Sequence, residues 1–403
     1  MRASRPFILQ LLLAACLWAS PALALTPQEE LGKSIFFDQT LSINSNQSCA
    51  SCHSPLAGWT GGDSAINSHG AVYEGSIPGR FGNRKPPSAA YATQSPILHR
   101  MTSGAFMGGN FWDGRATGEK LGSPTAEQAQ GPFLNPVEQA LNSPADVIAG
   151  ICASTYADTF RNVCGENACN LDTQYVGPSY DCVGYAVAAF EGSTQVNRFS
   201  SKFDAVMDGK TKFTKQEQQG LSLFSGKARC SKCHTIAPRG KRSLFTDYSY
   251  DNVGLPKNPE NPFYLMNEFN PDGAAWIDDG LGGFLSNRPD YAAVARENYG
   301  RHKVPTLRNV DQRAVADAVK AYGHNGYFKT LTGIVHYYNT RDVLTVCPDN
   351  YTEAEALAAG CWPLPENALN METSLLGNLG LTEREEAALV AFLATLSDGY
   401  YTP

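Results

Sequence analysis

The stretches Cys49-Ala50-Ser51-Cys52-His53 and Cys230-Ser231-Lys232-Cys233-His234 decide the fold of this 403-residue chain. The Cys-x-x-Cys-His spacing lets two thiols bond covalently to one porphyrin while the adjacent imidazole binds its iron. Zinc binding or stray thiols would account for a single copy, but two copies are not expected by chance. The sequence therefore predicts two covalently bound c-type haems, with His53 and His234 as iron ligands.

The same local pattern precedes both motifs. In each copy a Thr is followed three residues later by Glu, which is the capping box that opens a helix. A Gly and a Phe then follow at equal distances from the Thr. The matching residues are Thr26, Glu29, Gly32 and Phe36 in the first copy and Thr214, Glu217, Gly220 and Phe224 in the second. This repeat predicts a duplicated haem-binding module.

Length and composition fit a globular protein of two or three domains, because the apolar fraction is 42%. We predict an N-terminal domain over 25–205 and a C-terminal domain over 206–403, each carrying one haem. The formal net charge of −7 argues against nucleic acid as a partner.

The amino terminus resembles an export signal. A basic start precedes an apolar stretch from Phe7 to Trp18, and Ala22-Leu23-Ala24 offers a cleavage site. We therefore predict a signal peptide over 1–24 and a periplasmic protein. A competing interpretation is a lipoprotein site at Leu13-Ala14-Ala15-Cys16, which would leave Cys16 lipidated. No later stretch is long and apolar enough to span a bilayer.

The cysteines outside the haem motifs predict disulfides. Once Cys16 is set aside, six remain, an even number that suggests up to three bridges in an exported protein. They are Cys152, Cys164, Cys169, Cys182, Cys347 and Cys361. We expect Cys347 to pair with Cys361 and two bridges to form within 152–182, where the connectivity stays open.

Helical patterns dominate the rest of the chain. Apolar periodicity predicts helices over Ala145–Ala157, Val183–Phe190 and Thr382–Leu396, the last with a capping box at Thr382 and Glu385. The stretches 55–125 and 236–310 are rich in Gly, Pro and Asn and show few strand-like alternations. The predicted fold is mainly α with long loops.

Several motifs resemble those of the bacterial di-haem cytochrome c peroxidases and MauG. They are Phe111-Trp112-Asp113-Gly114-Arg115, Gly131-Pro132, Asn135-Pro136-Val137-Glu138, Val304-Pro305-Thr306-Leu307-Arg308-Asn309, His324-Asn325-Gly326 and Thr330-Leu331. The resemblance runs from about Leu25 to Leu396. It implies two all-helical cytochrome c-like domains, with the peroxide-reacting haem in the first and the electron-transfer haem in the second.

The resemblance also assigns the distal side of the first haem. Glu138 matches a Glu that acts on bound peroxide, and Gln128 and Pro132 line the same pocket. A carboxylate suits this role because peroxide must lose a proton from one oxygen and gain one on the other. The alternative for Glu138 is a solvated carboxylate at the start of a helix.

Two further residues are assigned in the same way. Trp112 matches a tryptophan between the haems, where an indole can relay an electron; the alternative is core packing. Arg115 is expected to pair with a haem propionate, because a guanidinium favours carboxylates.

The second haem needs a sixth ligand, which the family places fourteen residues after the His of its His-Asp/Asn-Gly motif. Counting from His324 gives Tyr338, the MauG type of ligand, with His336 and Tyr337 as rivals. A phenolate would lower the reduction potential relative to a thioether. His69, His99, His302 and His324 are expected to hydrogen-bond or to lie on the surface.

Three departures from the family pattern stand out. Lys85 stands where an Asn helps to bind calcium, so an ammonium group is expected in place of the ion. Six-residue insertions lie between Trp112 and Pro132 and between Asn309 and His324. Ala228 replaces the surface Trp through which electrons leave the protein substrate of MauG.

The predicted function is that of a di-haem peroxidase. It would reduce hydrogen peroxide to water with electrons from a small c-type cytochrome or cupredoxin. The alternatives are a MauG-like oxidase that modifies another protein or a small molecule, and a di-haem electron carrier without turnover. A homodimer is left open.

Overall fold

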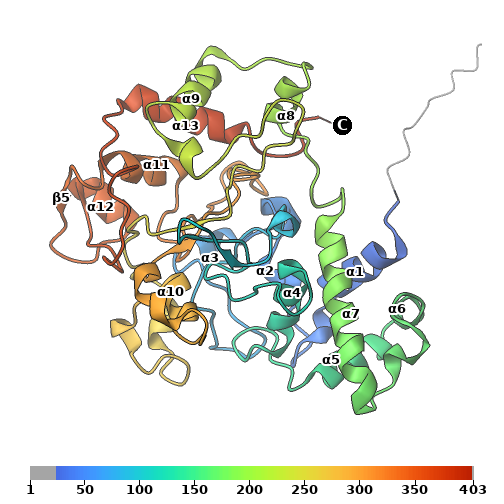
Figure 1. Cartoon of the computed structure of the whole chain (residues 1–403). Coiled ribbons are helices and arrows are strands. Elements are labelled where there is room, and N and C mark those ends of the chain that lie inside the picture. Colours follow the sequence, from blue (N-terminus) through green and yellow to red (C-terminus); the bar gives the residue numbers. More distant parts are fainter. Residues whose placement is uncertain (1–23, 402–403) are drawn as a thin grey trace, which may run out of the picture.

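The computed structural model describes residues 24–401, so the predicted signal peptide, apart from Ala24, and Cys16 lie outside the described residues. Thirteen α-helices, linked by long loops, are the main regular structure of the described chain (Figure 1). They are α1 (Pro27–Phe37), α2 (Cys49–Cys52), α3 (Ser64–Asn67), α4 (Pro124–Leu134), α5 (Pro144–Ala153), α6 (Ala157–Cys164), α7 (Thr173–Gly192), α8 (Lys202–Met207), α9 (Lys215–Ser225), α10 (Gly280–Leu285), α11 (Leu331–Thr340), α12 (Glu353–Ala359) and α13 (Glu383–Ala394).

The strands of the described chain are all two residues long and form three separate pairs. Their bounds are β1 (His99–Arg100), β2 (Phe106–Met107), β3 (Tyr250–Asp251), β4 (His302–Lys303), β5 (Thr345–Val346) and β6 (Cys361–Trp362). β1 pairs with β2 and β3 with β4 in antiparallel fashion, whereas β5 and β6 run parallel. The mainly helical prediction, with long loops over 55–125 and 236–310, is confirmed.

The predicted repeat is visible as two equivalent helix pairs. α1 packs on α7 in the first half of the chain, and α9 packs on α13 in the second (Figure 1). A Cβ atom at Gly32 would collide with the carbonyl of Ala186, and one at Gly220 would collide with the carbonyl of Ala388. Glycine is required at both positions because each helix pair is in backbone contact.

The capping boxes form as predicted at Thr26, Thr214 and Thr382. Two of the predicted helices have different bounds. α5 ends at Ala153 and not at Ala157, because the Ser154 hydroxyl bonds to the Ile151 carbonyl and turns the chain. α7 begins ten residues before Val183, in a polar stretch that lacks apolar periodicity and contains Pro178.

Two large apolar cores are formed mainly by residues before and after the predicted domain boundary at 205, although Phe203 belongs to the second core. One surrounds Phe36 and Phe190, and the other surrounds Phe224 and Phe392. The rings of Phe36, Phe190 and Trp59 meet edge to face, and those of Phe224, Phe392 and Phe245 do the same. The duplicated module therefore includes its aromatic core, while the boundary itself stays a prediction.

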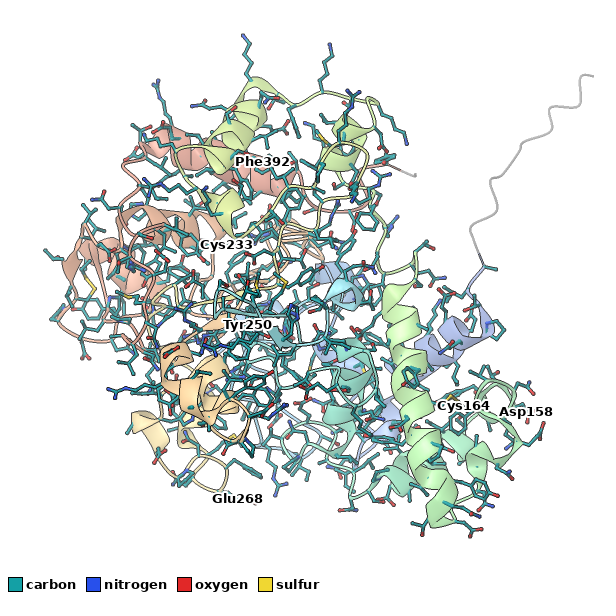
Figure 2. The ribbon with its side chains drawn as sticks, in the orientation of Figure 1. Asp158, Cys164, Cys233, Tyr250, Glu268 and Phe392 are labelled. Carbon is teal, nitrogen blue, oxygen red and sulfur yellow. A yellow bond between two sulfur atoms is a disulfide. The ribbon has the colours of Figure 1, made fainter. Side chains whose placement is uncertain are left out.

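Three disulfides stabilise the periphery, and the predicted set of six cysteines is confirmed. Cys347 pairs with Cys361, while Cys152 pairs with Cys169 and Cys164 with Cys182. The Cys152–Cys169 bridge joins α5 to the turn that follows α6, and the Cys164–Cys182 bridge joins the end of α6 to α7 (Figure 2). Among the described residues no helix is long and apolar enough to cross a membrane.

A buried ion pair joins α8 to the 304–309 segment. The Arg308 guanidinium, which is 0% exposed, donates to both Asp204 carboxylate oxygens at 2.6 and 2.8 Å. We expect Asp204→Ala to lower the free energy of unfolding by about 3–5 kcal/mol, because it leaves a buried charge without its partner. Denaturant unfolding of the holoprotein measures this. Asp158→Ala, at the exposed pair with Arg161, should cost less than about 1 kcal/mol; equal losses would contradict the prediction.

Candidate functional site

The first haem motif lies on the short helix α2, which directly precedes His53. The Nδ1–H of His53 lies 3.2 Å from the carbonyl oxygen of Trp59, and this contact orients the ring. Burial lowers the pKa of His53 to about 4, so the imidazole is neutral at neutral pH. Its Nε2 is then the atom free to bind a metal.

The second motif repeats this arrangement. The Nδ1 of His234 lies 2.9 Å from the carbonyl oxygen of Phe245, and burial lowers the pKa of His234 as well. Trp59 and Phe245, which accept these bonds, both have a left-handed backbone, with φ of 62° and 53°. That conformation is rare for large side chains. The identical device in both halves points to two equally prepared imidazole ligands.

The residues present fit two covalently held porphyrins. Cys49, Cys52, Cys230 and Cys233 are the four cysteines of the described chain that form no disulfide. Each pair of thiols directly precedes its oriented imidazole, and one continuous, mostly apolar cavity extends from His53 to His234. Thiols for thioether bonds, neutral imidazoles and an apolar enclosure are what a c-type haem requires.

The predicted distal residues lie together. Gln128 and Pro132 on α4 and Glu138 in the following loop line a smaller cavity that Cys52 and His53 also line. The loop is held in place because the Pro132 carbonyl, in the last turn of α4, accepts the backbone N–H of Gln139. The structure therefore brings all three residues to the side chain that would bind the first iron.

Glu138 is held in a defined position. Its Oε1 accepts a hydrogen bond of 2.6 Å from the Asn135 amide. Burial raises the pKa of Glu138, against the opposing effects of the Arg115 charge and the Asn135 hydrogen bond. A carboxylate with a raised pKa is a stronger base than a solvated carboxylate, which suits it to take up a proton from a bound molecule.

Trp112 is buried where the two halves of the chain meet. Its indole N–H donates to the Lys85 carbonyl at 2.8 Å, and its own carbonyl accepts the Lys303 backbone N–H at 2.8 Å. The indole lines the large cavity between His53 and His234 and meets the His324 ring edge to face, with 6.5 Å between centroids. This position suits both core packing and electron relay.

Arg115 forms a local ion pair. Its Nη1 lies 3.0 and 2.9 Å from the two oxygens of Asp113, and its guanidinium stacks 3.7 Å above the Phe111 ring. The side chain is 40% exposed. The expected bond to a haem propionate stays a prediction, and Asp113 is the carboxylate that this structure pairs with Arg115.

The three candidate sixth ligands on α11 point in different directions. The Tyr337 hydroxyl donates to the Gly254 carbonyl, and His336 Nδ1 lies 3.0 Å from Glu386. Tyr338 alone of the three lines the cavity that His234, Cys230 and Cys233 also line. Burial and the two nearby thiol groups raise the pKa of Tyr338.

Lys85, expected near the calcium position, is buried. Its ammonium donates to the Thr60 hydroxyl at 2.8 Å and to the Pro86 carbonyl at 3.0 Å, and burial lowers its pKa to about 8. Sequence reasoning missed a second buried lysine close by. The Lys320 ammonium donates to the carbonyls of Ala57, Asn309 and Gln312 and so joins the two halves of the chain.

A cluster of His302, His324 and Asp278 beside Trp112 was also missed, because its members are far apart in the sequence. The two imidazole rings stack at 3.5 Å and only 9° from parallel. Imidazole lone pairs lie in the ring plane, so two parallel stacked rings cannot both point at one metal ion. Arg84 already donates to both Asp278 oxygens, at 2.6 and 2.7 Å. The cluster is thus an ion-pair network and not a prepared metal site.

Comparisons with known proteins agree with this geometry. A sequence profile described as "Di-haem cytochrome c peroxidase" matches residues 26–212. The "Methylamine utilization protein MauG" of Paracoccus denitrificans is 35% identical over 93% of this chain and 89% of its own length. The chain belongs to the di-haem cytochrome c peroxidase and MauG family. Membership makes it an oxidoreductase with two c-type haems.

Other members of the di-haem peroxidase and MauG family are similar along most of the chain. The "Cytochrome c551 peroxidase" of Nitrosomonas europaea is 31% identical over 77% of this chain and 73% of its own length. The solved structure of the diheme peroxidase BthA from Burkholderia thailandensis covers 94% of this chain and 88% of its own, with 29% identity and a TM-score of 0.73. The family therefore includes proteins named for peroxidase activity as well as MauG.

Proposed function

We propose that this protein is a periplasmic di-haem peroxidase that reduces hydrogen peroxide to water with electrons from a small redox protein. The observation that carries the proposal is the shared cavity of His53, Gln128, Pro132 and Glu138. An electron carrier has no use for an acid–base group beside its iron ligand. The three disulfides agree with an oxidising compartment.

The residues around the first site have distinct tasks. A haem held by Cys49, Cys52 and His53 would supply an iron that exchanges electrons with peroxide. Glu138 would take the proton from one peroxide oxygen and return it to the other, so that one oxygen can leave as water when the haem supplies two electrons to the O–O bond. Gln128 would position the peroxide by donating a hydrogen bond.

Peroxide takes up two electrons and two protons to give two waters, so a route for electrons is required. Trp112 lies between the two sites, and the second haem would be held by Cys230, Cys233 and His234 with Tyr338 opposite. A small c-type cytochrome or cupredoxin would deliver the electrons there one at a time. Steady-state oxidation of a reduced cytochrome c tests the proposal. Two cytochromes oxidised per peroxide would support it, whereas no cytochrome oxidised and no peroxide consumed would indicate an electron carrier.

A MauG-like oxidase is the second candidate. Two observations favour it: Tyr338 lines the second site, and MauG is 35% identical. One observation counts against it: Ala228, which is buried beside Cys230, offers no aromatic relay to the surface at the position where MauG has a Trp. Consumption of peroxide without oxidation of a cytochrome, but with a change of mass in a second protein, would favour this function over the peroxidase.

Removal of calcium provides a further test. We expect metal analysis of unchelated holoprotein to find less than about one calcium per ten chains, because Lys85 and Lys320 already donate hydrogen bonds to buried oxygens near the family site. Chelation should leave the haem spectra unchanged. Stoichiometric calcium whose removal changes the spectra would contradict the expected replacement.

A further inference from the structure

Positive charge is concentrated in the segment 202–242, which carries the second haem motif. This basic segment holds ten Lys and Arg and three Asp and Glu, a net charge of +7, in a chain whose net charge is −7. The remainder of the chain is therefore at −14. Nine of the ten Lys and Arg of the basic segment are exposed, and Lys202 is the exception. So large an asymmetry produces a local field opposite in sign to that of the rest of the molecule.

The acidic residues of the basic segment offset only part of its positive charge. Asp204 is turned inward onto buried Arg308, and Glu217 pairs with Lys202 at 2.7 Å. Asp208 pairs with Arg242 at 3.0 Å. Six of the exposed basic side chains have no carboxylate within 4 Å among residues 24–401. They are Lys212, Lys215, Arg229, Lys232, Arg239 and Lys241.

Part of this charge lies directly beside the second haem motif. Arg229 precedes Cys230, and Lys232 lies between the two thiols. Arg229 donates to the Ser374 carbonyl at 2.7 Å, which brings the 372–376 loop to the motif. Leu375 and Leu376 of that loop line the cavity. Figure 2 shows Cys233 below the α9–α13 helix pair, on the side of the molecule away from Glu268.

We propose that this basic face, formed by the exposed Lys and Arg of 202–242 around Cys230, docks the acidic face of a small electron-donating protein. The inference rests on the proposed function, in which electrons enter at the second haem. Opposite charges around an electron-entry point raise the rate of encounter by about 10 to 10³ at low salt and orient the donor's redox centre toward Cys230. Half-buried Leu375 and Leu376 would form the apolar centre of the contact.

A redox protein fits this face better than an extended polyanion does. The rest of the chain has a net charge of −14, which would repel an anionic polymer or membrane surface that reached beyond the basic segment. Transient electron-transfer contacts are small, and a footprint centred on Cys230 would include the exposed Arg229 and Lys232. The donor's acidic residues should therefore cluster around its own redox centre.

The test compares two forms of one redox protein that differ in the sign of their surface charge. Reduced mitochondrial cytochrome c, which is basic, is compared with the same protein after succinylation of its lysines. Stopped-flow rates of probe oxidation by the peroxide-treated holoprotein are measured from about 10 to about 200 mM ionic strength. We expect the succinylated probe to react at least about tenfold faster at low salt, with the difference shrinking as salt rises. Equal rates, or faster reaction of the basic probe, would overturn the proposal.

Matched variants locate the effect. Arg229→Glu/Lys232→Glu should slow the succinylated probe about tenfold, whereas Arg100→Glu/Lys120→Glu reverses two exposed charges in the first half of the chain and should change the rate less than about twofold. Equal losses in both would mean that net charge matters and the face does not. The single variant Lys232→Glu controls for misfolding, because the Lys232 ammonium makes no hydrogen bond within residues 24–401 that the substitution could remove. Calorimetric binding of the succinylated probe tests the face even if the protein ignores peroxide, in which case only the proposed function fails.

Discussion

Glu138→Gln is expected to lower the rate of peroxide reduction by about 10²- to 10⁴-fold while leaving both haems attached. The reason is chemical and local. Gln keeps the size of the side chain and can still meet the Asn135 amide, but it cannot take up a proton. Glu138 is the only carboxylate among the predicted distal residues, and buried Glu191 is a second carboxyl group that lines the same cavity.

The pH dependence distinguishes this role from a structural one. Burial raises the pKa of Glu138, so the reactive carboxylate form is lost as the pH falls through a value above the ordinary 4.5. The rate of the wild type should therefore rise with pH through that raised pKa, and the rate of Glu138→Gln should not. Stopped-flow absorption at several pH values measures both. Glu30→Gln, at an exposed position on α1, is the control, and a Glu138→Gln rate within about threefold of it would contradict the assignment.

Tyr338→Met is expected to raise the reduction potential of the second haem by a few tenths of a volt, within the roughly 0.8 V that axial ligands span. A phenolate stabilises the oxidised iron, whereas a thioether favours the reduced one. The higher potential should make the electron donor reduce this haem more completely and should weaken its ability to hold an oxidising equivalent. Spectroelectrochemical titration measures the shift.

Two further variants control for this interpretation. Tyr338→Phe should leave the second iron without its sixth ligand and convert its low-spin spectrum to high-spin. Tyr337→Phe should leave the spectrum and potential unchanged, because the Tyr337 hydroxyl is bonded to the Gly254 carbonyl. A spectral change in Tyr337→Phe together with none in Tyr338→Phe would reverse the assignment of the ligand.

Features encoded over short distances could be predicted from the sequence. The haem motifs and the capping boxes at Thr26, Thr214 and Thr382 depend on neighbours within four residues. The Cys347–Cys361 bridge was predictable because no other free cysteine lies near. The resemblance to the family supplied Gln128, Pro132 and Glu138, and the structure places them together beside His53.

Features that depend on tertiary contacts could not be predicted. Cys152 pairs with Cys169 and Cys164 with Cys182, but pairing Cys152 with Cys164 and Cys169 with Cys182 would close two loops of similar length, so loop entropy alone does not choose between these two pairings. Arg84 meets Asp278 across 194 residues, and nothing local to either indicates the other. The left-handed backbone at Trp59 and Phe245 was equally hidden, since neither residue type favours it.

The most direct test of the central claim is the absorption and EPR spectrum of the oxidised holoprotein before and after one equivalent of hydrogen peroxide. If the first iron is open to peroxide beside Glu138 and the second is bound by Tyr338, the resting protein shows one high-spin and one low-spin haem. Both signals then disappear together, because the two oxidising equivalents are shared across Trp112. Two low-spin haems that peroxide leaves unchanged, both in the oxidised protein and after addition of one electron, would contradict the account and identify an electron carrier.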